Sequence, residues 1–142
     1  MALVQYIYTS VLATQMTPQH AYNACLLSAD LCRKFGISGR VFANCQQALA
    51  IIEGPDAVAT RYFKAVSEDP MAATVLLHVK REIAVREFPD FSILLNVDYP
   101  FAPDRYVKPL TAETMQDVWP KNLSAKVRIL AEAYLDPEML AC

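Results

Sequence analysis

The segment from Ile37 to Pro55 constrains the fold most, because glycine-containing turns bracket two short apolar runs in it. Residues 37–43 and 47–52 are rich in apolar and β-branched side chains, a composition typical of strands. Only residues 44–46, a short polar stretch in which Asn44 can adopt a left-handed backbone, separate the two runs. The segment therefore predicts an antiparallel β-hairpin.

The residues around this hairpin alternate between strand and helix patterns. The predicted elements are, in chain order, a strand at residues 3–9, a helix at 18–35, strands at 37–43 and 47–52, a helix that opens at Gly54-Pro55-Asp56 and stops at Asp69-Pro70, and strands at 74–80 and 91–97. This order predicts an α+β fold, a ferredoxin-like plait whose five-stranded mixed sheet carries two helices on one face. The groove between those helices is then the expected ligand site.

The first predicted helix has a small-sided face toward the sheet. Its members fall at three- and four-residue steps and are Ala21, Ala24, Cys25, Ser28, Cys32 and Phe35. Such a face predicts either close packing on the sheet or a space in which a flat ligand fits.

The composition changes after residue 98. A proline-rich stretch at residues 99–109 predicts an extended connector, and helices are expected at residues 112–119 and 125–135. Val127, Leu130, Ala131 and Tyr134 line one side of the last helix. We therefore expect one domain at residues 1–98, and a connector with C-terminal helices at 99–142 that pack on this domain or mediate dimerisation.

Composition and charge exclude several classes of function. The 142 residues are 54% hydrophobic with a net charge of −2, and the basic residues form no cluster, so neither nucleic acid nor a membrane surface is an expected partner. No basic leader or spanning apolar run is present, which predicts a cytoplasmic protein. The four cysteines form no CxxC pair, so we expect free thiols and no metal site.

Several motifs together resemble one known family. They are Ile37-Ser38-Gly39, Ile52-Glu53-Gly54-Pro55, and the Ile83, Arg86 and Phe88 of an I-x-x-R-x-F pattern. Their spacing resembles that of the BLUF family, sensors of blue light using FAD, over roughly the first two thirds of the chain. The resemblance implies the plait predicted above, with a flavin held between its two helices.

Four positions correspond to the flavin pocket of this family. Tyr8 matches the tyrosine that bonds the switching glutamine, and Ser28 matches a serine that faces the ring. Cys32 stands where the family has an asparagine, and Ala50 where it has that glutamine. A thiol is a weak hydrogen-bonding group and a methyl group makes no hydrogen bonds, so the resemblance implies a pocket without its two amides.

Other positions near the implied cofactor also differ from the family. Met71 and Ala72 replace an Arg-His pair, which removes positive charge for an anionic cofactor, and Phe91 and Ile93 replace a tryptophan and a methionine. We therefore predict no bound cofactor, or FAD if the family function is retained. Such an apolar cleft is either repacked by neighbouring side chains or occupied by a hydrophobic molecule.

The predicted function is that of a BLUF-fold regulatory protein that has lost flavin binding and acts through protein contacts, as a homo-oligomer or on another protein. The alternative is an FAD-binding blue-light photoreceptor with an altered pocket. No catalytic residue is predicted, because no histidine or asparagine is placed to activate Cys32, and His78 lies in a strand pattern. Residues 10–13 lack the arginine that an acylphosphatase needs after the first strand.

Overall fold

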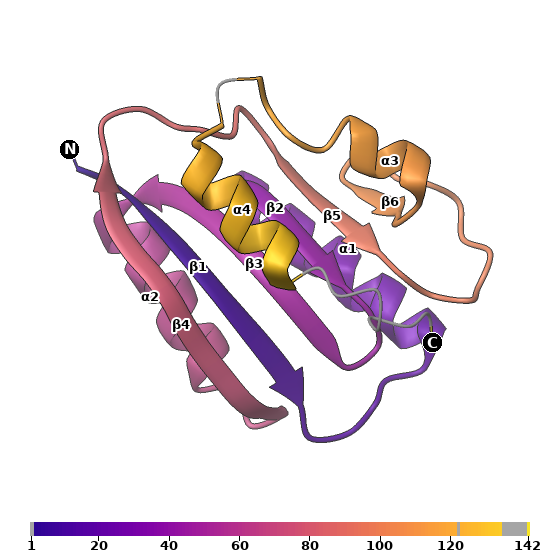
Figure 1. Ribbon diagram of the computed structural model, residues 1–142. Helices are drawn as coiled ribbons and strands as arrows, with labels where there is room; N and C mark the ends of the chain where they lie inside the picture. Colours follow the sequence, from indigo (N-terminus) through magenta and orange to yellow (C-terminus); the bar gives the residue numbers. More distant parts are fainter. Residues whose placement is uncertain (1, 122, 135–141) are drawn as a thin grey trace.

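The computed structural model of the chain describes residues 2–121, 123–134 and 142. Its elements are β1 (Leu3–Leu12), α1 (Pro18–Lys34), β2 (Ser38–Ala43), β3 (Gln47–Pro55), α2 (Asp56–Ser67), β4 (Ala72–Ile83), β5 (Phe91–Leu95), β6 (Val107–Pro109), α3 (Ala112–Gln116) and α4 (Ala125–Tyr134). Figure 1 shows them arranged around one sheet. The expected α+β fold and the hairpin of β2 and β3 are confirmed.

The sheet has six strands in the order β4-β1-β3-β2-β5-β6, one more than expected. Strand β6 lies in the stretch predicted to be a connector, and it pairs in parallel with β5, with Ile93 donating its N–H to the carbonyl of Tyr106 at 2.7 Å. The prolines between residues 100 and 109 had indicated an extended connector here and not a strand. Pro109 is tolerated because it ends a short strand at the edge of the sheet, where one N–H is not needed.

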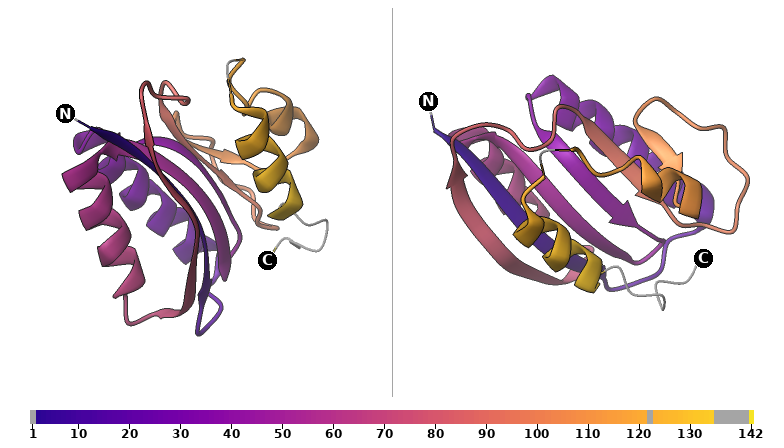
Figure 2. Two further views of the ribbon diagram at one scale, coloured as in Figure 1. Left: turned by 60° about the vertical axis from the view of Figure 1, so that its left-hand side comes forward. Right: turned by 45° about the horizontal axis from the view of Figure 1, so that its top comes forward.

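Helices α1 and α2 cover the same face of the sheet, as Figure 2 shows. Thr17 caps α1 by accepting the N–H of His20, and Gly36 follows its end with a φ of 71°. Small side chains of α1, among them Ala21, Cys25 and Cys32, are buried against the sheet. Phe35, expected on this face, is 61% exposed because it caps the end of the helix and no longer follows its periodicity.

The opposite face of the sheet is covered by the C-terminal segment, with α4 lying across the strands in Figure 2. Val118, Val127 and Ala131 are buried there against Ile7 and Phe42. The structure does not describe the side chains of Leu130 and Tyr134, nor the predicted helix end at Leu135. The sheet is thus a middle layer with an apolar core on each side.

The turn between β2 and β3 is closed by a side chain. The Asn44 Oδ1 atom accepts the N–H groups of Gln46 and Gln47 at 2.8 and 2.7 Å. Asn44 does not adopt the expected left-handed backbone, since the positive φ values in the described part of the chain belong to Gly36 and Gly39. The side chain bends the turn by hydrogen bonding, as asparagine does in Asx turns.

A disulfide joins Cys45, in this turn, to Cys142, with the two Cα atoms 5.9 Å apart. The expectation of four free thiols is therefore wrong for this pair, whereas Cys25 and Cys32 are free and buried. The two bonded cysteines are 97 residues apart in the chain, so no spacing rule could pair them. The Cys142 carbonyl also accepts the N–H of Asp98 at 2.7 Å.

Two charged residues hold the loop between β4 and β5. Glu53 is fully buried, and its Oε1 atom accepts the N–H groups of Glu87 and Phe88, both at 2.9 Å. Arg86 donates to the Ser38 hydroxyl and to the carbonyls of Glu53 and Gly36. The roles of Glu53 and Arg86 are therefore to position backbone next to the hairpin.

Candidate functional site

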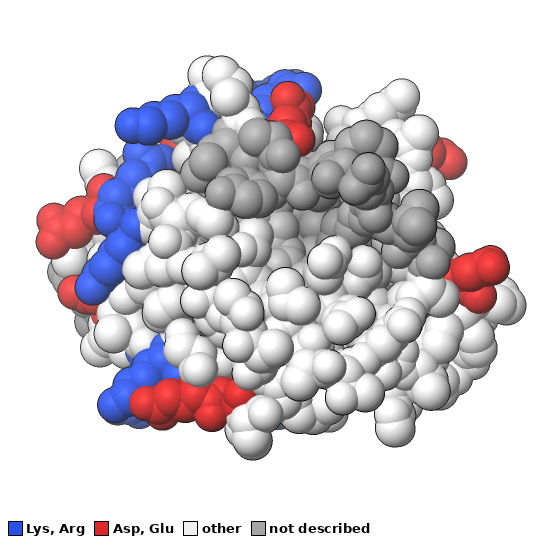
Figure 3. Space-filling model, turned by 60° about the horizontal axis from the view of Figure 1, so that its bottom comes forward, with Lys and Arg blue, Asp and Glu red and all other residues white. Residues whose placement is uncertain are grey.

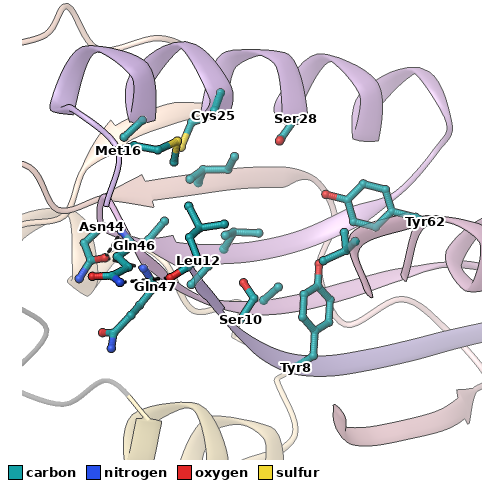
Figure 4. Close-up of a pocket in the computed structure, with 18 of the residues that line it drawn as sticks. Tyr8, Ser10, Leu12, Met16, Cys25, Ser28, Asn44, Gln46, Gln47 and Tyr62 are labelled. Atoms are coloured by element: carbon teal, nitrogen blue, oxygen red, sulfur yellow. Dashed lines mark hydrogen bonds between the residues drawn. The ribbon is translucent and has the colours of Figure 1, made fainter. Parts of the chain in front are cut away.

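A cavity of about 190 Å³ lies between α1 and the sheet. Figure 4 shows side chains from β1, α1, α2 and the β2–β3 turn pointing into it. Most of its wall is apolar, and the residues lining it include Leu12, Met16, Ala21, Ala24, Val41, Ala43, Ala48, Val66, Phe91 and Ile93. The cavity occupies the groove in which the plait was expected to bind a ligand.

Tyr8 and Ala50 face this cavity from neighbouring strands. They are direct partners in the antiparallel ladder of β1 and β3, and both are buried. Because side chains alternate between the faces of a sheet, Ile7 and Ile51 point into the other core. The Ala50 methyl group next to Tyr8 supplies no hydrogen-bonding partner for the tyrosine hydroxyl.

Tyr62 on α2 lies near the Tyr8 hydroxyl and near the thiol of Cys32 on α1, and its hydroxyl interacts electrostatically with both. In Figure 4 both tyrosine side chains reach into the same end of the cavity, one from α2 and one from β1. Tyr8 also makes an edge contact with Phe63, at 5.1 Å between ring centroids. The hydroxyl of Tyr62 thus connects β1, α1 and α2 at one end of the cavity.

These three groups stay uncharged at neutral pH. Burial raises the pKa of the Tyr8 hydroxyl and of the Tyr62 hydroxyl above their ordinary values. Burial also raises the pKa of the Cys32 thiol to about 11, although the Tyr62 hydroxyl acts in the opposite direction. A thiol protonated at neutral pH is a poor nucleophile, so the cluster does not resemble an activated cysteine.

Helix α1 contributes Ser28 and Cys25 to the cavity wall. Ser28 is half-buried, and burial raises the pKa of the Cys25 thiol to about 12. Cys32 lies one turn after Ser28 and is fully buried, but its side chain packs behind the wall and does not line it. Of the four positions that the family resemblance implies, the structure therefore brings Tyr8, Ser28 and Ala50 to one cavity, with Cys32 beside it.

The other end of the cavity is polar but already bonded internally. Asn44 closes the β2–β3 turn, and the Gln46 side chain donates to the carbonyl of Leu12 at 3.1 Å. Among the described residues that line the cavity there is no lysine, arginine or histidine. Met71, at one of the two expected cationic positions, is 52% exposed. The cavity therefore offers an anionic ligand no positively charged side chain.

Tyr62 is the cavity residue that the sequence analysis missed. Its place in α2 follows from apolar steps near 3.6 residues, which indicate only that it faces the sheet. Its hydroxyl finds Tyr8 because α2 crosses β1 at this point, with the Tyr6 hydroxyl also bonded to Thr60 at 2.9 Å. The periodicity of a helix does not predict where that helix packs on a strand, so the sequence could not predict this contact.

The family model for BLUF, sensors of blue-light using FAD, matches residues 3–94. The chain therefore belongs to the BLUF family, a class of sensor domains. No curated protein sequence is significantly similar to it.

Solved BLUF structures have the same fold. The dark-state structure of the BLUF protein BlrB is 25% identical over 66% of this chain and 71% of its own, with a TM-score of 0.57. The BlrP1 BLUF structure is 17% identical, covers 97% of this chain and 93% of its own, and has a TM-score of 0.69. In Klebsiella pneumoniae BlrP1 with manganese and cyclic diGMP the match covers 94% of this chain but only 33% of that longer protein, at 16% identity and a TM-score of 0.68.

The cavity residues do not fit directional binding of a flavin ring edge. Neither position 32 nor position 50 has an amide, and the hydroxyls of Tyr8 and Tyr62 interact with each other across the cavity end. In the described part of the chain no group of histidine, cysteine and acidic side chains could hold a metal ion. No described helix is both long and apolar enough to cross a lipid bilayer.

Proposed function

We propose that this BLUF-fold chain is a regulatory module that does not hold flavin tightly and acts through contacts with protein. The observation that carries the proposal is that Ala50 lies directly opposite the buried Tyr8 in the ladder of β1 and β3. The tyrosine that would work with a glutamine amide therefore has a methyl group as its strand neighbour. Such a pocket has no amide to rearrange in response to light.

The energetic argument has two parts. Each hydrogen bond that a buried ring edge loses costs on the order of 1 kcal/mol or more, so the loss of two amides weakens binding by roughly thirtyfold or more. A ligand at the end of the cavity lined by Tyr62 also competes with the interactions of this hydroxyl with Tyr8 and Cys32. Both effects oppose a flavin, and the described residues of the wall include no lysine, arginine or histidine that offsets them.

An alternative function is that of an FAD-binding blue-light photoreceptor with an altered pocket. The observation in its favour is that Tyr8 and Ser28, which the family resemblance assigns to the flavin pocket, line one cavity. Backbone groups and an apolar wall then carry the binding. On either reading the chain is a cytoplasmic protein that performs no catalysis and binds neither nucleic acid nor a membrane.

The deciding experiment is a flavin titration of the purified full chain. We expect a colourless protein and no saturable quenching of FAD fluorescence. Cys32→Asn combined with Ala50→Gln restores the two amides, and its uptake of FAD would indicate that the cavity is intact and lacks only these groups. Ala48→Gln adds the same amide two residues along the same strand face and is the matched control. A yellow wild-type sample with a reversible light-induced red shift would support the alternative.

A further inference from the structure

The two edges of the sheet differ strongly in how they are protected. The edge strand β6 has three residues, carries Lys108 and ends in Pro109, features that discourage pairing with another strand. The other edge strand, β4, has twelve residues, and in the described sheet it pairs only with β1. One long strand edge is therefore available for backbone hydrogen bonds.

The first two thirds of β4 lack the charges that commonly protect an edge, and its charged residues Lys80, Arg81 and Glu82 lie at its end. Residues 70–79 contain no lysine, arginine, aspartate or glutamate, and β4 contains no proline. Leu76 and Leu77 are 55% and 45% exposed in the middle of the strand, and Met71 before it is 52% exposed. Large exposed apolar side chains beside an unpaired strand edge mark an interaction surface.

The uncharged surface continues beyond the strand. Residues 1–29 and 41–52 contain no lysine, arginine, aspartate or glutamate. Figure 3 shows the end of the molecule where β1 ends and β4 begins, with a wide uncharged area in the middle and charges near its margin. A partner for this region has to be uncharged itself, because an unpaired charge is costly to bury.

From these observations we infer that β4 is a dimerisation edge, which pairs antiparallel with β4 of a second copy of this chain. The inference rests on the proposed function in that it names the protein contact of that module. Two-fold symmetry requires that one residue of the strand lie opposite the same residue of the second copy. Leu76 or Leu77, in the middle of the strand, meets this condition. Lys80 and Arg81 of one copy then lie opposite residues between Met71 and Thr74, which are uncharged.

A second copy fits better than an open assembly for a geometric reason. Pairing of β4 with β4 uses the same surface on both copies and closes after two. Pairing of β4 with β6 would build a filament, and Lys108 and Pro109 oppose it. The strand also has register irregularities in its pairing with β1 on both sides of residues 74–77, so the regular part of the edge is limited to the centre. Pairing is thereby limited in length and fixed in register.

Sedimentation velocity of the full chain over a concentration series tests the inference. We expect a dimer, and Leu76→Lys and Leu77→Lys each raise its dissociation constant by at least about tenfold, since each places two lysines near the two-fold axis. Ile129→Lys, at a position of α4 that is 68% exposed, is the matched control and leaves the dimer intact. Far-ultraviolet circular dichroism and thermal unfolding check that all variants fold.

Cysteine crosslinking then measures the register. Under oxidation Leu76→Cys or Leu77→Cys gives a covalent dimer, whichever residue faces its own copy, while Val85→Cys does not. A wild-type monomer at every concentration overturns the inference, as does a dimer that both lysine variants leave unchanged. The flavin titration is a separate readout. A dimer that binds FAD tightly would contradict the proposed loss of flavin but would still agree with the inference that β4 is the dimerisation edge.

Discussion

Ala50 on β3 lies directly opposite Tyr8 on β1 in the antiparallel ladder. With a methyl group as its strand neighbour, the Tyr8 hydroxyl interacts with Tyr62 of α2. This interaction connects the sheet to a helix. Its removal is therefore expected to affect the packing of α2 on β1.

Tyr62→Phe is expected to lower the free energy of unfolding by about 1–3 kcal/mol, because it leaves the buried Tyr8 hydroxyl without this partner. Urea unfolding monitored by circular dichroism measures the change. Tyr22→Phe is the control, since the Tyr22 hydroxyl donates to the Ala102 carbonyl in an exposed position and its loss costs less. Equal effects in the two variants would argue against a special role for Tyr62.

Gly39→Ala is expected to destabilise the fold by about 3 kcal/mol or more. Gly39 has a φ of 141°, and a Cβ atom at this residue would lie 1.9 Å from the carbonyl oxygen of Ile51. Gly36→Ala meets no atom within 4 Å and costs only about 1–2 kcal/mol for its left-handed backbone. Thermal unfolding of both variants checks this order, and the reverse order would contradict the close approach of β2 and β3.

The Cys45–Cys142 disulfide is expected to contribute about 2–5 kcal/mol to stability, because it closes a long loop in the unfolded chain. Urea unfolding with and without reductant measures this difference. Cys142→Ser should unfold at the same urea concentration in both conditions. Alkylation of the unfolded, unreduced protein should modify two thiols, Cys25 and Cys32, and modification of all four would show that the bond is absent.

Glu53 is expected to make stability depend on pH. Burial raises the pKa of its carboxyl above the ordinary value, although N–H groups of Gln5, Glu87 and Phe88 donate to it. The protonated form is therefore favoured by folding, and this contribution is fully present below the unfolded pKa of about 4.3 and lost as the pH rises through the folded pKa. Glu53→Gln removes this dependence.

Urea unfolding of wild type and Glu53→Gln at a series of pH values tests the sign. The stability of the variant relative to wild type should rise with pH above about 4. Glu82→Gln, at an exposed position of β4, controls for the loss of one carboxylate. A relative stability that falls with pH would mean that the three donors outweigh burial.

The sequence was most informative where the chemistry is local. The two apolar runs and the polar turn between residues 37 and 52 depend on neighbours within a few residues, so they predicted the hairpin. Strand β6 could not be predicted, because its three residues become a strand only by pairing with β5. Its prolines pointed to a connector, and tertiary pairing overrode them.

The candidate site was predictable in part, through the family resemblance. The resemblance assigned Tyr8, Ser28 and Ala50 to one pocket, and in the structure all three line one cavity. Tyr62 was missed because its role depends on how α2 crosses β1. The bond between Cys45 and Cys142 was missed because the two residues meet only after folding.

The two-sided burial of β3 has a mechanical consequence. Ala50 and Ile51 are adjacent in the chain, yet one faces the cavity and the other the core beneath α4. Close-packed interiors do not absorb displacement, so whatever widens or fills the space beside Ala50 also shifts Ile51. Strand β3 is therefore the shortest route by which a change in packing between α1 and α2 is transmitted to the C-terminal helices.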